Sequence, residues 1–225
     1  ASFGGRGLET DSDFYRRISE RLRHKNRAVT QWDYEHLILE EFPDLILVKC
    51  LNHTSPTCFN APGHVTIVVV PSTRQFDPEK IIYPRVSSGK LEEIKMFVSK
   101  YISPAMEIHV INPDYEKLSV TVNIKIHQGL DFNFYQNQLK KDISNFLSPW
   151  AFENNVLLNF NKEFHKSQIL YFIENLSYID YISKLELRLE NKLTESVVRP
   201  SSPKNIIVSD RFHSVHLSID NCPKV

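Results

Sequence analysis

Cysteine and glycine are both scarce in this 225-residue sequence. The three cysteines, Cys50, Cys58 and Cys222, are too few and too scattered for a disulfide framework. Three of the six glycines lie between Gly4 and Gly7, but no strand precedes them and no Gly-Lys-Ser/Thr follows, so they do not form a phosphate-binding motif. No apolar run approaches the roughly 20 residues that span a bilayer, and the N-terminus lacks the apolar core of a signal peptide.

Net charge is also absent, because 27 basic residues balance 27 acidic ones. Nothing global therefore attracts the chain to nucleic acid or to an anionic membrane. The composition, 41% hydrophobic and 24% charged, is that of an ordinary globular protein. A chain of this length forms one large or two small domains and buries about 70% of its unfolded surface.

One local cluster of charge stands out, on a helix predicted from about Asp11 to Lys25. The basic residues on this helix include Arg16, Arg17, Arg21 and Arg23. An apolar stripe repeats at four-residue steps, formed by Phe14, Ile18 and Leu22. We interpret the arginines as a partner-binding surface, since arginine is enriched in protein interfaces, with nucleic-acid phosphates as the alternative ligand. Three aromatics, Tyr15, Trp32 and Trp150, fit either an interface or the core.

The first half of the chain reads as a mixture of helices and strands. Thr30 and Asp33 have the spacing of a capping box, which predicts a helix that ends before Pro43. Strands are predicted at 45–50, 64–70 and 107–111, the second of them central, and a helix at 91–102.

The second half opens on a strictly alternating strand from Leu118 to Ile126, which predicts one buried and one exposed face. Asp131 caps a predicted helix that ends at Leu147. Further elements are predicted at 156–160 (short strand), 167–176 (helix) and 205–209 (short strand). Between the helix at 167–176 and the short strand at 205–209, a further strand is predicted. Its residues Tyr181, Leu185, Leu187 and Leu189 lie on one face.

These elements predict an α+β fold without the regular alternation of a doubly wound sheet. We expect two small domains, each a short mixed or antiparallel sheet packed with helices, preceded by an N-terminal helical pair. The expected divisions are an entry linker and basic helix (1–26), a first α+β domain (27–113), a second α+β domain (114–190) and a C-terminal tail with a short strand (191–225).

Catalytic and metal-binding motifs are missing. No serine or cysteine lies in a nucleophile elbow, and the adjacent carboxylates Glu40 and Glu41 point to different sides of a helix. His53, Cys58 and His64 lie close in sequence, but their spacing is irregular and a fourth zinc ligand has no candidate. We therefore expect no catalytic residue, no cofactor and no metal site.

The stretch Arg27–Pro43 resembles the baseplate J-like family of contractile phage tails and related injection systems. The matching residues are Arg27-Ala28-Val29-Thr30, Asp33-Tyr34-Glu35, Phe42-Pro43, Pro62-Gly63-x-Val65 and Asn112-Pro113-x-Tyr115. Two further stretches, 147–152 and 206–209 followed by His213, are similar to members found in extracellular phage-tail-like particles. The resemblance covers nearly the whole chain from Gly4, and because family members are longer, the chain matches their C-terminal part.

The resemblance implies a structural role without catalysis or a cofactor. Such proteins are baseplate wedge subunits, so the expected partners are other wedge subunits, with hub or sheath-initiating proteins as further candidates, in a hetero-oligomeric particle. No nucleic acid and no membrane is expected as a partner. Assembly is expected in the bacterial cytoplasm, followed by residence in a phage tail or an extracellular particle. The rival hypotheses are an envelope-remodelling enzyme beside such a particle and a nucleic-acid-binding module that uses the basic helix.

Overall fold

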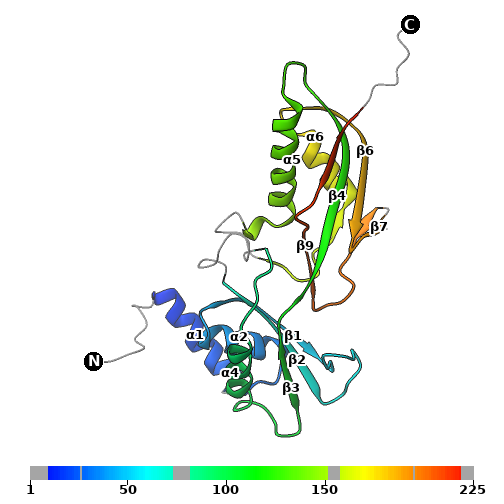
Figure 1. The fold of residues 1–225 in the computed structure, drawn as a ribbon. Helices are drawn as coiled ribbons and strands as arrows, with labels where there is room; N and C mark the ends of the chain where they lie inside the picture. Colours follow the sequence, from blue (N-terminus) through cyan, green and yellow to red (C-terminus); the bar gives the residue numbers. More distant parts are fainter. Residues whose placement is uncertain (1–9, 26, 73–81, 152–157, 195, 219–225) are drawn as a thin grey trace. The chain divides into compact units, whose positions relative to one another are not determined.

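A computed structural model describes residues 10–25, 27–72, 82–151, 158–194 and 196–218 of the chain (Figure 1). The chain divides into two compact units, the first formed by residues 1–72 and 85–112 and the second by residues 73–84 and 113–225. Each unit combines helices with a small sheet, so the predicted α+β class is confirmed. None of the described helices is long and apolar enough to cross a membrane.

The first unit packs helices against a three-stranded sheet. Its elements are α1 (Asp11–His24), α2 (Gln31–Glu41), β1 (Leu45–Asn52), β2 (His64–Pro71), α4 (Ser88–Val98) and β3 (Glu107–Ile111). The strand order is β1-β2-β3, antiparallel between β1 and β2 and parallel between β2 and β3. The sheet is therefore mixed, and β2 is central, as its run of β-branched residues predicts.

The predicted capping box starts α2. The Thr30 hydroxyl accepts a hydrogen bond from the Asp33 backbone N–H at 3.2 Å, and the Asp33 carboxylate accepts one from the Thr30 N–H at 2.8 Å. The helix ends at Glu41, just before Phe42 and Pro43. These signals fix where α2 begins and ends, so that it presents Leu37 and Ile38 to the core of the first unit.

Cys50 lies in this core and is fully buried, as its apolar surroundings in the sequence suggest. Burial, reinforced by the nearby Glu35 carboxylate, raises the pKa of the Cys50 thiol to about 12. Cys58, in contrast, is exposed. The thiol of Cys50 is thus a small core side chain rather than a nucleophile.

Cys50 should therefore resist alkylation while the chain is folded. At about pH 8, only about one Cys50 thiol in ten thousand is in the reactive thiolate form. The test is a short iodoacetamide pulse in a Cys222→Ser background, followed by mass spectrometry. Cys58 should be labelled in the folded chain, whereas Cys50 should be labelled only after unfolding in urea. Equal labelling of both residues in the native chain would contradict the buried position.

The second unit is built around β4 (Asp114–Ile126), the longest strand. The other elements are α5 (Phe132–Leu147), the 3₁₀ turn η2 (Pro149–Ala151), β5 (Phe164–His165), α6 (Lys166–Glu174), β6 (Ile179–Leu189), β7 (Lys192–Thr194), β8 (Val197–Val198), β9 (Asn205–Ser209) and β10 (Ser214–Leu217). β4 pairs antiparallel with β6 on one side; on the other it pairs parallel with β9 along its first half and with β10 along its second. The helices α5 and α6 cover one face of this sheet (Figure 1).

The predicted alternation of β4 is confirmed. Leu118, Val120, Val122 and Ile124 are fully buried, while the intervening side chains are partly exposed. Against them pack the apolar residues of the two helices, including Leu139, Ile143, Ile169 and Ile173. The residues that make these contacts recur at every second position in the strand and at every third or fourth position in the helices, so they lie on one face of each element.

The prediction that Tyr181 shares one face of β6 with Leu185 and Leu187 is wrong, because Tyr181 is exposed whereas the two leucines are buried. The pairing of β6 with β4 shifts twice, so that Ile182 lies opposite Ile124 and Ile179 opposite Ile126. Each shift inserts one residue and moves the following side chains to the other face. Tyr181 consequently lies on the outer face, where the Lys125 ammonium approaches its ring at 5.4 Å.

Two further segments differ from the sequence-based expectation. Of the short strand predicted at 156–160, residues 156 and 157 lie outside the described part of the chain, and residues 158–160 are not a strand. The segment expected as a tail with one short strand contributes three strands, β7, β9 and β10, to the sheet. The expected division at 113/114 and 190/191 into separately folding domains stays a prediction.

Candidate assembly surface

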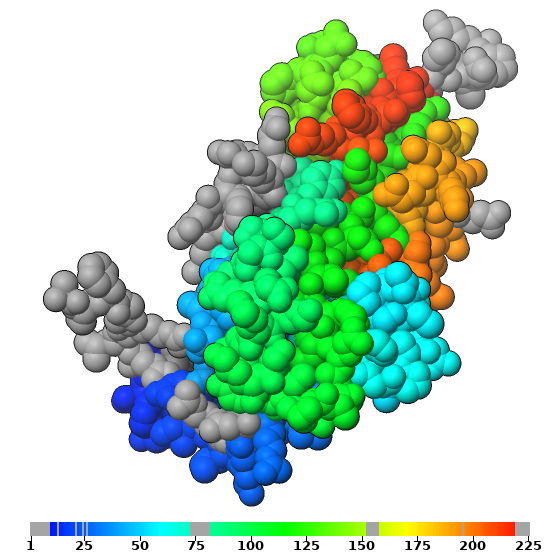
Figure 2. Space-filling view, turned by 60° about the horizontal axis from the view of Figure 1, so that its bottom comes forward, coloured from blue at the N-terminus to red at the C-terminus, as the bar shows by residue number. Residues whose placement is uncertain are grey.

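Helix α1 presents apolar side chains to solvent. Phe14 is 42% exposed, Tyr15 69% and Leu22 70%. Among the α1 residues whose side chains are described, none belongs to the buried core of the first unit. Figure 2 shows the blue atoms of this helix at the surface. The predicted stripe therefore exists, but it faces outward.

The predicted arginines lie on this helix, although not all in the same surroundings. Arg16 is exposed and Arg17 half-buried, with its guanidinium 5.5 Å from the centre of the Phe14 ring. Arg23 lies over the Trp32 ring at 4.2 Å, and Trp32 in turn stacks on His36. The side chain of Arg21 is not among those described. Arg23 thus joins α1 to α2 by a cation–π contact.

An exposed apolar stripe bordered by arginines has the chemistry of a protein interface. Arginine and aromatic residues are the types enriched where proteins bind one another. Asp11 and Glu20 on the same helix offset part of the basic charge, which weakens the case for nucleic acid as the ligand. Of the other two aromatics considered, Trp32 is half-buried and Trp150 belongs to the core.

A second apolar hollow, which the sequence analysis missed, lies between α5 and α6. Its volume is about 580 Å³, and four of its eight lining residues are aromatic: Phe146, Phe164, Tyr171 and Phe172. Phe146 and Phe172 stack with their ring centres 4.4 Å apart. The sequence contains one indication of this hollow. Tyr171 is two residues from each of the buried Ile169 and Ile173, so it cannot share their face of α6.

A buried serine–histidine pair in the second unit bears on the rival enzyme hypothesis. The Ser209 hydroxyl lies 2.9 Å from His213 Nε2, but both residues are buried. His213 Nδ1 accepts a hydrogen bond from the Val120 N–H at 3.1 Å, so in the neutral ring Nε2 carries the proton and donates to Ser209. A general base for this serine would need the opposite tautomer. The pair therefore holds β9 and β10 against β4 instead of activating a nucleophile.

The three residues weighed as zinc ligands do not converge. His64 lies at the start of β2 beside two residues of β3, whereas His53 and Cys58 are exposed loop residues outside that group.

Comparison with known proteins places these features in a family. The model of the PVC11-like baseplate proteins matches residues 1–205, which is most of the chain. The chain belongs to the PVC11-like baseplate protein family. The prediction of a baseplate protein is thereby confirmed, whereas membership of the baseplate J-like family is not.

A solved structure shares the fold of this PVC11-like protein. A chain in the cryo-EM structure of the anti-feeding prophage baseplate, 6-fold symmetrised, superposes with a TM-score of 0.69 at 18% sequence identity. The match covers 92% of this chain but only 43% of that one. A search of curated protein sequences finds no match. The PVC11-like protein thus spans less than half the length of a structurally similar baseplate chain.

Proposed function

We propose that this PVC11-like protein is a structural wedge subunit that acts through protein–protein contacts and catalyses no reaction. The observation that carries the proposal is the outward-facing apolar and arginine-bearing surface of α1, in a member of a baseplate family. An exposed apolar surface of this kind is typical of a protein whose apolar side chains become buried when it binds its partners. A relation to the baseplate J-like wedge proteins is part of the same proposal.

The partners proposed for this surface are neighbouring wedge subunits, with hub or sheath-initiating proteins as further candidates. The contacts would form in the bacterial cytoplasm and persist in the phage tail or extracellular particle. The mixture of apolar side chains and arginines on α1 favours a partner that offers apolar area together with carboxylates, since arginine binds carboxylates through two parallel hydrogen bonds.

Removal of the apolar stripe should reduce incorporation of the chain into particles. The variant Phe14→Ser, Tyr15→Ser, Leu22→Ser removes exposed side chains, so the thermal midpoint should stay nearly unchanged. If each of the three side chains contributes about 1–2 kcal/mol to the binding free energy, the triple variant should bind its partner at least about 100-fold more weakly. Particle yield and cross-linking in purified particles measure the effect.

The matched control replaces exposed apolar residues elsewhere, by Phe59→Ser, Leu193→Ser and Phe212→Ser. These residues are 54%, 63% and 80% exposed, so the control loses comparable surface without touching α1. It should assemble normally. Normal assembly of the α1 variant would refute the proposed interface, as would equal losses in both variants.

Charge reversal on α1 should also impair assembly. Arg16→Glu, Arg17→Glu and Arg21→Glu replace the cations with anions that would repel an acidic partner. The control variant, Lys100→Glu, Lys141→Glu and Lys192→Glu, makes the same change in net charge at other exposed positions and should assemble. Intact particles from the arginine variant would contradict the role of these side chains, and salt-dependent binding of the wild-type chain to duplex DNA would support the nucleic-acid alternative instead.

A further inference from the structure

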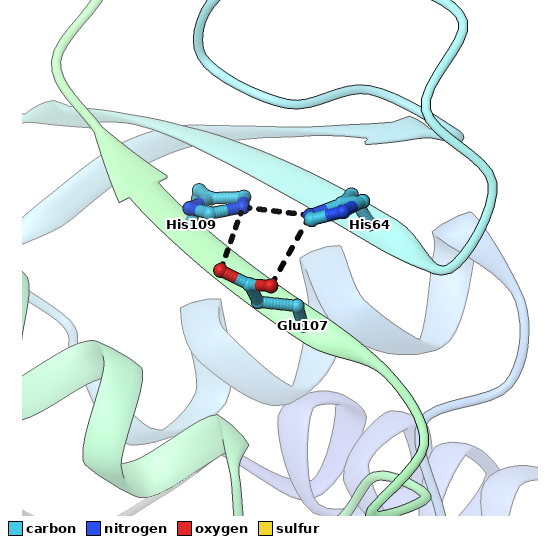
Figure 3. Close-up of side chains that lie close together, drawn as sticks. All are labelled: His64, Glu107 and His109. Carbon is cyan, nitrogen blue, oxygen red and sulfur yellow. Dashed lines mark hydrogen bonds and ion pairs between the residues drawn. The ribbon is translucent and has the colours of Figure 1, made fainter.

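Two histidines and a glutamate converge at the start of β2 and β3. His64 is the first residue of β2, and Glu107, the first residue of β3, lies directly opposite it in the parallel register. His109 is two residues farther along β3 and hence on the same face as Glu107. Figure 3 shows the two rings and the carboxylate pointing toward one another.

The ligand atoms of this cluster lie at the separations that a small metal ion requires. His64 Nδ1 is 3.1 Å from His109 Nε2. Glu107 Oε2 lies 3.5 Å from His64 Nδ1, and Glu107 Oε1 lies 3.6 Å from His109 Nε2. For metal–ligand bonds of about 2.0–2.2 Å in a tetrahedron, neighbouring ligand atoms are about 3.3–3.6 Å apart. One ligand atom from each residue lies within 4.8 Å of the other two, so a small shift of the side chains would close the group around an ion.

The backbone holds the three side chains in place before any ion binds. The Glu107 N–H donates to the Gly63 carbonyl at 2.8 Å, which joins the residue before His64 to the first residue of β3. Gly63 itself has a φ of 84°, a left-handed conformation that favours glycine and turns the chain into β2. Sites built on paired strands hold their ligands more rigidly than sites built on loops.

We propose that His64, Glu107 and His109 bind one divalent transition-metal ion of the zinc type. Two imidazoles and a carboxylate suit zinc and its neighbours, whereas magnesium and calcium prefer oxygen ligands only. Glu107 is 65% exposed at its side chain, so the fourth position faces solvent and takes a water molecule in the isolated chain. The bound ion joins the ends of β2 and β3 and thereby stabilises the edge of the first unit.

This proposal replaces the expectation of no metal site, which rested on residues close in sequence. His64 and His109 are 45 residues apart, and only the parallel pairing of β2 with β3 brings them together. The site is independent of the α1 surface, because α1 supplies none of its ligands.

Zinc titration of the full chain tests the site. Calorimetry should give one ion per wild-type chain, and the thermal midpoint should rise with zinc concentration, because the ion binds the folded state. His64→Ala and His109→Ala should each weaken binding by more than about 100-fold, beyond the loss typical of outer-shell partners. The control His127→Ala removes an exposed histidine of the second unit and should bind as the wild type does.

Two measurements keep the test decisive if an alanine variant misfolds. Glu107→Gln preserves shape at an exposed position, so it should fold normally and bind zinc at least about tenfold more weakly. NMR of the ring nitrogens should show zinc on Nδ1 of His64 and Nε2 of His109, and the cobalt-loaded chain should lack a thiolate charge-transfer band. The absence of stoichiometric binding, or binding that persists in both histidine variants, would overturn the proposal.

Discussion

Lowering the pH from about 7.5 to about 5 should reduce the free energy of unfolding by about 2 kcal/mol through His213 alone. Burial lowers the pKa of this histidine from 6.5 to about 4, although Asp210 acts in the opposite direction. Between these two values the unfolded chain binds a proton that the folded chain excludes. The stability that His213 contributes is therefore complete above about pH 6.5 and is lost as the pH falls toward 4.

The hydrogen bonds of His213 explain why the folded chain excludes this proton. Nδ1 already accepts the Val120 N–H, so its protonation would break that bond and leave a cation that is only 5% exposed. The nearby Lys140 further disfavours a positive charge. Acidification should consequently loosen the junction of β9 and β10 with β4 first.

Urea unfolding at both pH values, compared between the wild type and His213→Ala, measures this effect. At neutral pH the variant should be less stable by about 2–4 kcal/mol, because it leaves the Val120 N–H without an acceptor, removes the hydrogen bond to the Ser209 hydroxyl and creates a cavity. Its stability should fall less on acidification, by the 2 kcal/mol that His213 contributes. His216→Ala, an exposed neighbour on β10, should keep the wild-type pH dependence. A variant without His213 that loses stability as steeply as the wild type would rule out this assignment.

The parts of the fold that the sequence predicts well are governed by interactions within one element. The Thr30–Asp33 capping box needs only four consecutive residues, and the buried face of β4 follows from its own alternation. Tyr181 was misplaced because the irregularities in β6 arise in its pairing with β4. A shift of pairing is a property of two strands, so the period of one strand does not reveal it.

The same distinction, between features of one element and features that depend on several elements, applies to the candidate sites. The α1 stripe is visible at four-residue spacing, but whether such a stripe faces the core or solvent depends on what the rest of the unit leaves uncovered. The grouping of His64 with Glu107 and His109 depends on the register of two strands distant in the chain. The role of β9 and β10 was likewise hidden, because buried polar side chains of β4 and of the C-terminal segment hold these strands in place.

Glu116 should be the most sensitive of these polar residues to substitution. Only 6% exposed on β4, its carboxylate accepts hydrogen bonds from the Ser201 N–H at 3.0 and 3.2 Å and from the Asn205 side-chain amide. Glu116→Ala removes the charged acceptor of both donors, of which Asn205 is half-buried and Ser201 is exposed. A hydrogen bond to a charged group contributes about 1.5–3 kcal/mol. We therefore expect a decrease of about 3–5 kcal/mol in the free energy of unfolding, measured in urea.

Two comparisons separate the hydrogen bonds of the buried Glu116 carboxylate from the effect of its charge alone. Glu116→Gln keeps an acceptor oxygen for Ser201 and should cost less than the alanine variant. Glu163→Ala removes a carboxylate that pairs with Arg199 at 3.1 Å in a largely exposed position, so it should cost no more than about 1 kcal/mol. Hydrogen exchange should locate the effect, with faster exchange along β9 in Glu116→Ala and unchanged exchange in Glu163→Ala. Similar losses in the two alanine variants would mean that charge, rather than the buried acceptor, holds the C-terminal strands on β4.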